Sequence, residues 1–167
     1  MIPSRIYVCG FMGSGKSTVG PLLAARLNYD FADTDADIER REGVSVSDIF
    51  TAHGETRFRA LETEALQSLS GRKSLVVALG GGILMNPDHL VQVRKSGFLI
   101  YLRTSLPVIK SRLRGGYDRP LLKSGDMETL LAVRKPGFEQ ADFVIDTDDR
   151  TPEGVVEGIL STAFFEL

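Results

Sequence analysis

The sequence is poor in cysteine and has no excess of positive charge. Its only cysteine, Cys9, cannot form a disulfide within the chain, and because it lies in an apolar run we expect a buried thiol without a chemical role. The formal net charge is -2 and the isoelectric point is about 5.7, so there is no basic field for nucleic acid and no polybasic run for a membrane. We therefore expect no nucleic-acid partner and no membrane association.

Long hydrophobic runs are also absent. No apolar stretch could span a bilayer, and glycines and a lysine interrupt the first one too early for a secretory signal. We therefore expect a cytoplasmic protein. There is no internal repeat and no low-complexity tract, and 167 residues with 43% hydrophobic and 25% charged side chains fit a single globular domain over residues 1–167.

Short apolar runs alternate with helical patterns along the chain, which is typical of a parallel sheet with crossover helices. The apolar runs predict five strands, at residues 5–10, 29–33, 74–79, 97–102 and 142–146. The helical patterns predict helices at residues 16–27, 35–42, 46–70 with a break at Gly54, 87–95, 105–113, 126–140 and 152–165. The starts at Pro87 and Pro152 are the best defined, because each proline follows a residue that can cap a helix.

Residues 10–18, GFMGSGKST, match the pattern G-x-x-x-x-G-K-[ST] directly after a predicted strand and at the start of a predicted helix. The glycines let the backbone curl so that successive amides face inward, and the helix adds its positive dipole end. Lys16 can reach the outer phosphates of a nucleotide, and the hydroxyl of Ser17 suits Mg²⁺. This loop predicts binding of ATP or GTP through Gly13, Ser14, Gly15, Lys16, Ser17 and Thr18.

Two further absences narrow the class of nucleotide-binding protein. No Asn-Lys-x-Asp segment follows a late strand, which argues against a GTPase. The acidic residue that often ends the third strand of such proteins is missing, and Gly80, Gly81 and Gly82 stand there instead. Three glycines at the carboxyl end of a strand allow a ligand to approach the backbone, although a tight turn is the plainer alternative.

Asp33 ends the second predicted strand, and Asp35 lies in the turn that follows. Their plainest role is to cap the helix that comes next. A Mg²⁺ ion bound with the nucleotide would need a carboxylate in place of the one missing after the third strand. Asp33 is the candidate, because the second strand ends at the same edge of the sheet. Asp35 is then available to orient an acceptor hydroxyl and to take its proton.

Arg59 and Glu62 lie three residues apart on one face of a predicted helix. Such a pair is usually a solvated surface bridge. The alternative is that Glu62 holds Arg59 toward the cleft, where its two parallel donors would suit a substrate carboxylate.

Residues 114–126 are rich in glycine, proline and charge, which is typical of a mobile loop. Glycines on both sides of Arg119 and Pro120 favour a lid over the nucleotide. Its closure would bring Arg119 to the charge that develops on the transferred phosphoryl group.

Together these motifs resemble the shikimate kinases, in order and over nearly the whole chain. They are GSGKST at 13–18, DTD at 33–35, FRALE at 58–62, GGG at 80–82, RPLL at 119–122 and RKPGFEQAD at 134–142. The resemblance implies an α/β P-loop fold of three layers with a five-stranded parallel sheet in the order 2-3-1-4-5. It also implies ATP-dependent phosphorylation of the 3-hydroxyl of shikimate, giving shikimate 3-phosphate and ADP in the biosynthesis of chorismate and aromatic amino acids.

The same resemblance implies roles for single residues. Lys16, Asp35 and Arg119 would be catalytic, and Ser17 and Asp33 would serve Mg²⁺. Shikimate would contact Asp35, Arg59, Gly80, Gly81, Gly82 and Arg134, with its binding part at about 34–62. Arg119 would reach the ATP phosphates, and Arg112, Arg150 and Pro152 would flank the adenine. The chain departs from the family's R-x-P-L-Y motif at Gly137 and Phe138, which concerns the packing beneath Arg134.

Two other functions remain as alternatives. The nearer is a kinase for another small polyol acid such as gluconate, against which the FRALE and GGG motifs argue. The farther is a nucleotide-binding module that regulates a partner without catalysis. The family's chemistry needs only one chain, so we expect a monomer.

Overall fold

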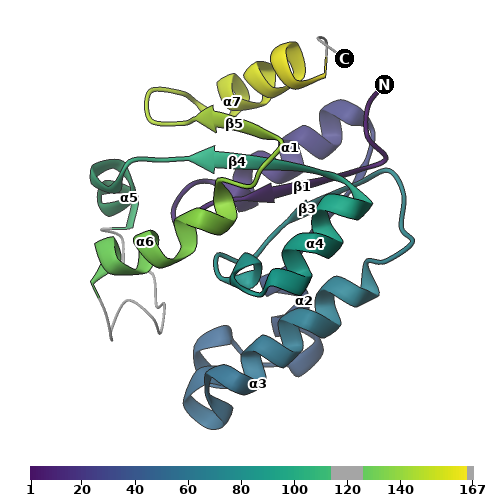
Figure 1. Ribbon diagram of the computed structural model, residues 1–167. Helices are drawn as coiled ribbons and strands as arrows, with labels where there is room; N and C mark the ends of the chain where they lie inside the picture. Colours follow the sequence, from purple (N-terminus) through teal and green to yellow (C-terminus); the bar gives the residue numbers. More distant parts are fainter. Residues whose placement is uncertain (114–125, 165–167) are drawn as a thin grey trace.

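A five-stranded sheet forms the middle layer of the computed structural model, which describes residues 1–113 and 126–164 (Figure 1). Its strands are β1 (Arg5–Cys9), β2 (Asp30–Asp33), β3 (Leu75–Ala78), β4 (Phe98–Arg103) and β5 (Phe143–Asp146). All neighbours pair in parallel, in the order β2-β3-β1-β4-β5. This confirms both the number of strands and the predicted order.

Seven α-helices lie in the described part of the chain. They are α1 (Lys16–Leu27), α2 (Thr34–Glu42), α3 (Val46–Ser68), α4 (Pro87–Ser96), α5 (Leu106–Leu113), α6 (Met127–Phe138) and α7 (Pro152–Gly158). Asn86 and Thr151 cap α4 and α7 with their side chains, as their place before a proline predicts. Inside α3, Gly54 has φ 78° and ψ 178°, which confirms the predicted break.

Some predicted boundaries are wrong. Helix α6 is shorter than predicted at both ends, because Asp126 is its N-cap and Glu139 is already its C-cap. The last predicted helix changes into a π-helix, η3, at Ile159–Ala163. A short 3₁₀ helix, η1, at Ile83–Met85 follows the three glycines and was not predicted.

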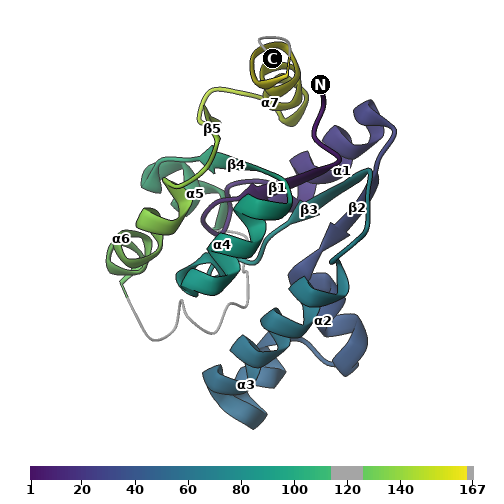
Figure 2. The same cartoon turned by 45° about the vertical axis from the view of Figure 1, so that its right-hand side comes forward.

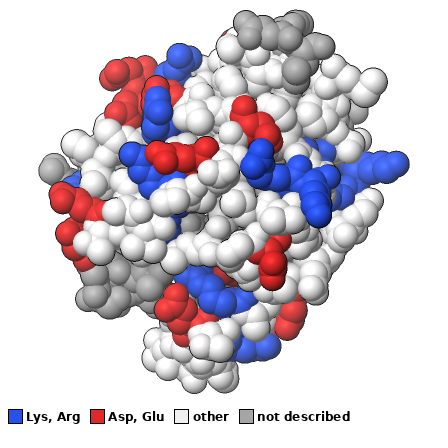
Figure 3. Space-filling view, viewed as in Figure 1, with Lys and Arg blue, Asp and Glu red and all other residues white. Residues whose placement is uncertain are grey.

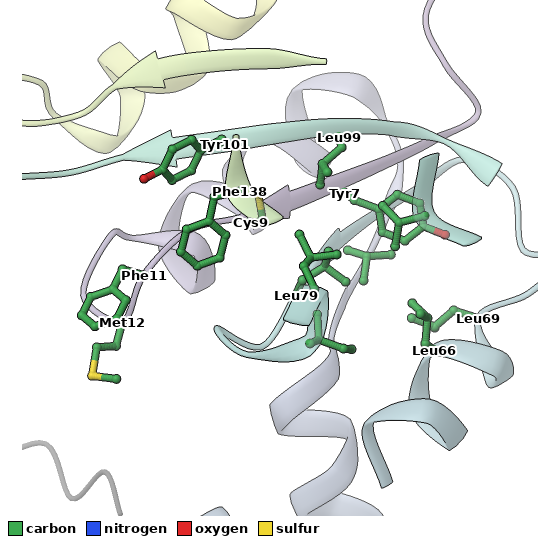
Figure 4. Packing of buried hydrophobic residues seen from close by; sticks show 14 of the residues in the cluster. Tyr7, Cys9, Phe11, Met12, Leu66, Leu69, Leu79, Leu99, Tyr101 and Phe138 are labelled. Carbon is green, nitrogen blue, oxygen red and sulfur yellow. The ribbon is translucent and has the colours of Figure 1, made fainter. Parts of the chain in front are cut away.

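The two faces of the sheet bury alternate residues of the same strands, as the strand period of two requires. Tyr7, Cys9, Leu99 and Tyr101 point to the face that is covered by α4, α6 and the end of α3 (Figure 4). Ile6, Val8, Ile100 and Leu102 point to the face that is covered by α1 and α7. Both faces are therefore buried, and the functional groups are left to the loops at the carboxyl ends of the strands.

Cys9 lies in the first of these clusters, and only 1% of its surface is exposed. Burial raises the pKa of its thiol to about 12, which the nearby charge of Lys16 offsets only in part. The thiol is thus protonated and inert at neutral pH, as predicted.

Helices α2 and α3 pack together beside the β2 edge of the sheet and have a small core of their own (Figure 2). This core contains Ile38, Ile49, Phe58, Leu61 and Ala65. On the face in Figure 3, basic and acidic side chains are interspersed and do not form one field. Within residues 1–113 and 126–164, no helix has the length and apolar character to cross a membrane.

Candidate active site

The loop between β1 and α1 is formed by glycines in conformations that other residues rarely adopt. Gly10, Gly13 and Gly15 have φ values of 156°, 75° and 96°. Across this loop, the ammonium group of Lys16 donates to the carbonyl oxygens of Gly10 at 2.7 Å and Phe11 at 3.1 Å. The loop therefore has the curled shape, the helix N-terminus and the lysine that its sequence predicts.

The carboxylate of Asp33 has two sets of partners. One oxygen, Oδ1, accepts from the backbone amides of Asp35 at 3.0 Å and Ala36 at 3.1 Å, and so caps α2. The other oxygen, Oδ2, accepts from the hydroxyl of Ser17 at 2.7 Å. Asp33 thus caps the helix, which was the plainest role predicted for these aspartates, and also bonds the serine of the phosphate-binding loop. Its role as a ligand for Mg²⁺ stays a prediction.

A cavity of about 700 Å³ opens in front of this loop. Its walls include all of residues 13–18, together with Asp33 and Asp35 and with Arg112, Arg150 and Pro152. The guanidinium of Arg112 donates to the carbonyl oxygen of Gly13 at 3.0 Å. Glu39, Ser45 and Ser47 also line the cavity. These three were not predicted, since only the fold of α2 back onto α3 brings them there.

A second, smaller pocket of about 40 Å³ contains most of the predicted acceptor site. Its polar walls are Asp35, Arg59, Glu62 and Arg134, with the backbone of Gly81 and Gly82. Its apolar walls are Met12, Val46, Phe50 and Phe58. Of these, Met12, Val46 and Phe50 were not predicted. Asp35 and Val46 line both the cavity and the pocket, so the two spaces meet there.

Each of the three glycines gives room to one charged side chain. A Cβ on Gly80 would lie 2.5 Å from Oδ1 of Asp35, one on Gly81 would lie 2.9 Å from Nη1 of Arg134, and one on Gly82 would lie 2.7 Å from Nη1 of Arg59. None of the three has a positive φ, so space and not backbone conformation requires glycine here. The three glycines thus make room for acceptor-site side chains, and their predicted approach to a ligand stays a prediction.

Glu62 holds Arg59 in place within the pocket. Nη1 of Arg59 donates to both carboxylate oxygens of Glu62, at 2.9 and 2.8 Å, and Nη2 donates to Glu55 at 3.2 Å. Glu62 is only 1% exposed, which excludes the solvated surface bridge. Burial raises the pKa of Glu62, although the charges of Arg59 and Arg134 oppose this rise. Burial also opposes the charge of Arg59, but Glu62 and Glu55 together outweigh it and raise its pKa.

Arg134 reaches the pocket from α6 and is 5% exposed. Its guanidinium lies 5.8 Å from the centre of the Phe11 ring, in the phosphate-binding loop. Beneath it, Phe138 stacks on Tyr101 with ring centres 5.2 Å apart. At the departure from the family motif, Phe138 is therefore part of the core, so the departure concerns packing, as predicted. Arg119 and the rest of residues 114–125 lie outside the described residues.

The fold and the site together define a P-loop kinase, with a cavity lined by the phosphate-binding loop and a smaller charged pocket that meets it at Asp35. The sequence model described as shikimate kinase matches residues 12–164. The chain belongs to the shikimate kinase family.

Individual relatives agree with this assignment. The shikimate kinase of Geobacter sulfurreducens is 48% identical over 159 residues, which cover 93% of this chain and 88% of the relative. A solved structure described as shikimate kinase from Acinetobacter baumannii in complex with shikimate is 34% identical, has a TM-score of 0.93, and is matched over 99% of this chain and 95% of its own. A gluconokinase from Sinorhizobium meliloti 1021 is 21% identical with a TM-score of 0.56, over 96% of this chain and 91% of its own, a likeness of fold alone.

Proposed function

We propose that the chain transfers the γ-phosphoryl group of ATP to the 3-hydroxyl of shikimate, with Asp35 as the residue at which the two substrates meet. The observation that carries this proposal is the position of Asp35 on the walls of both spaces. A nucleotide in the cavity would present its outer phosphate toward Asp35. An acceptor in the pocket would present a hydroxyl to the same carboxylate.

On the nucleotide side, the amides of residues 13–18 and the ammonium of Lys16 bind the phosphates. The hydroxyl of Ser17 and Oδ2 of Asp33, 2.7 Å apart, are hard oxygen donors at the same place, which suits Mg²⁺. Such an ion would neutralise charge on the β- and γ-phosphates. Arg112, Arg150 and Pro152, which line the same cavity, are proposed to flank the adenine.

On the acceptor side, Arg59 and Arg134 bind the carboxylate of shikimate, and Asp35 accepts a hydrogen bond from the 3-hydroxyl. The hydroxyl oxygen attacks the γ-phosphorus, the bond to the bridging oxygen of ADP breaks, and the hydroxyl proton passes to Asp35.

Arg119 is proposed to reach the phosphates from a lid at about 114–126, on sequence grounds alone. The same holds for a single domain over residues 1–167 with its shikimate-binding part at about 34–62. We further infer a monomeric, cytoplasmic enzyme, because each site is built from one chain and no basic field favours nucleic acid or a membrane.

The test is release of ADP by the isolated chain with Mg²⁺, ATP and either shikimate or gluconate. Shikimate-dependent release, with at most background release on gluconate, is the expected result. Faster turnover of gluconate would overturn the assignment of the acceptor. No turnover of either acid, with ATP still bound, would favour the regulatory module.

A further inference from the structure

His89 is a buried histidine outside the phosphate-binding loop and outside both ligand spaces. It lies in the first turn of α4 and is 4% exposed. Its Nδ1 is 2.9 Å from the carbonyl oxygen of Ile83, and its Nε2 is 2.9 Å from the hydroxyl of Thr63. One imidazole ring therefore joins α4, the 3₁₀ helix η1 and the long helix α3.

The partners of the ring define its tautomer. A carbonyl oxygen can only accept, so Nδ1 must carry a hydrogen and donate it to Ile83. In the neutral ring, Nε2 is then an acceptor, and it takes its hydrogen bond from the hydroxyl of Thr63. The same hydroxyl is 3.2 Å from the carbonyl oxygen of Arg59, one helical turn earlier, and because it has a single hydrogen these two acceptors compete for it. The side-chain nitrogen of Asn86 also lies 3.4 Å from Nε2.

Both ends of this bridge lie next to the acceptor pocket. Ile83 directly follows Gly82, whose missing Cβ makes room for the Arg59 guanidinium. Thr63 directly follows Glu62 and lies one turn after Arg59. The distance between α3 and the Gly81–Gly82 backbone determines where Arg59 and Glu62 lie in the pocket. His89 is hydrogen-bonded to Thr63 on α3 and to Ile83, which follows Gly82.

We propose that His89 is a positioning residue for the acceptor site, which holds the Arg59–Glu62 pair of α3 against the glycine turn through its hydrogen bonds to Thr63 and Ile83. This inference rests on the proposed function, because it assigns the pair to acceptor binding. His89 touches neither substrate in this scheme. Its loss should therefore weaken acceptor binding without weakening nucleotide binding.

The plainer alternative is that His89 is only a satisfied polar group in the core. In that case its hydrogen bonds would contribute to stability and to nothing else. The two cases differ in a kinetic quantity, the KM for shikimate compared with the KM for ATP.

Two variants remove the same hydrogen bond from opposite ends. Thr63→Val keeps the shape of the side chain and removes the hydroxyl, and His89→Asn keeps a donor near Nδ1 but cannot reach Thr63. We expect each to raise the KM for shikimate about three- to tenfold, the range that corresponds to one lost hydrogen bond, and to leave the KM for ATP unchanged. Thr63→Ser retains the hydroxyl, so this variant should keep the wild-type KM for shikimate.

The double variant separates a shared bond from two independent effects. If both single changes break the same contact, His89→Asn with Thr63→Val should raise the KM for shikimate no more than either change alone. Additive increases would overturn the proposed bridge.

A matched control lies at the opposite end of the sheet. The hydroxyls of Tyr7 and Ser96 form a hydrogen bond of 2.8 Å between β1 and the end of α4. Ser96→Ala removes that bond, and it should lower the melting temperature by a similar amount while leaving both KM values unchanged. If the His89 and Thr63 variants behave in the same way as this control, the inference is wrong and the proposed function stands. If the wild-type chain does not turn over shikimate, both are wrong.

Discussion

At the scale of single residues, the reaction depends most on Asp35. Its carboxylate does not cap α2, because Asp33 accepts the hydrogen bonds of the first amides. A change to asparagine therefore leaves the helix cap in place. We expect Asp35→Asn to lower turnover by about 10² to 10⁴, the range for loss of a general base, and to leave ATP affinity near wild type. Steady-state ADP release and nucleotide titration measure the two effects, and near-normal turnover would remove Asp35 from the reaction.

A substitution at Gly82 tests whether the missing Cβ is needed to make room for the Arg59 guanidinium. At its φ of -109°, alanine is allowed, so Gly82→Ala should not strain the backbone. The new Cβ would instead displace the Arg59 guanidinium, which is the end of a flexible side chain. We expect an unchanged or slightly higher melting temperature and a rise of about tenfold or more in the KM for shikimate.

Gly154 of α7 provides the control variant for Gly82. A Cβ on Gly154 would also make a close contact, 3.2 Å from Oγ1 of Thr151, but it would lie outside the acceptor pocket. Gly154→Ala should leave the KM for shikimate unchanged. Equal kinetics in both variants would show that Arg59 adjusts to the new Cβ without loss of binding.

What could be predicted for these residues depended on distance along the chain. The phosphate-binding loop and the DTD aspartates are local patterns with local mechanics, so both were located in advance. That Gly82 makes room for Arg59 is a contact between positions 23 apart, and no local pattern contains it. The same holds for His89, whose partners Thr63 and Ile83 are brought together only by packing.

At the scale of elements, α3 carries a buried carboxylate whose charge is costly. Burial raises the pKa of Glu62, and the charge of Asp35 adds to the rise that Arg59 and Arg134 oppose. Because the pKa is higher in the folded than in the unfolded chain, folding takes up a proton between the two values. The contribution of Glu62 to the free energy of unfolding is thus present below the ordinary glutamate pKa and is lost as pH rises through the raised value.

Glu62→Gln cannot ionise, so it lacks this dependence. Urea unfolding of both proteins between about pH 4 and 8 should show wild-type stability falling relative to the variant as pH rises. A difference that grows in favour of wild type with rising pH would mean that pairing with Arg59 outweighs the burial of Glu62.

Helix α6 carries Arg134 into the pocket, and its last residue, Phe138, is buried in the core against Tyr101. We expect Arg134→Ala to weaken shikimate binding by about 2 to 5 kcal/mol, the usual cost when one partner of a buried charge pair is removed. Arg134→Lys should restore little of this, because the ammonium lacks the planar fork. Calorimetry with shikimate measures the change, and normal binding by both variants would exclude Arg134 from the acceptor site.

Among the elements, periodicity and caps predicted the helices and strands well where they begin with a clear signal. The starts at Lys16, Pro87 and Pro152 were all correct. The ends were less exact, because tertiary packing decides where a helix stops, as in the change from α7 to η3. Helix η1 was missed because its three residues are too few for a periodic pattern.

At the scale of the whole molecule, nucleotide binding should stabilise the fold through the contacts on α1 and β2. ATP with Mg²⁺ at 100 times its Kd should raise the free energy of unfolding by about 2.7 kcal/mol. Because Ser17 and Asp33 are the proposed metal ligands, chelation of Mg²⁺ should reduce the shift in wild type more than in Ser17→Ala. Thermal unfolding with and without a chelator measures this, and an equal effect of chelation in both proteins would argue against Ser17 as a ligand.

The meeting of the two spaces at Asp35 also has a consequence for inhibition. A single compound with a nucleoside at one end and a cyclic carboxylic acid at the other could occupy both spaces, with its linker passing Asp35. Once one end is bound, the other is held at a millimolar effective concentration, so the affinity can exceed that of either half by about 10² to 10⁴. Because both spaces share the walls Asp35 and Val46, a short, stiff linker should give the largest gain.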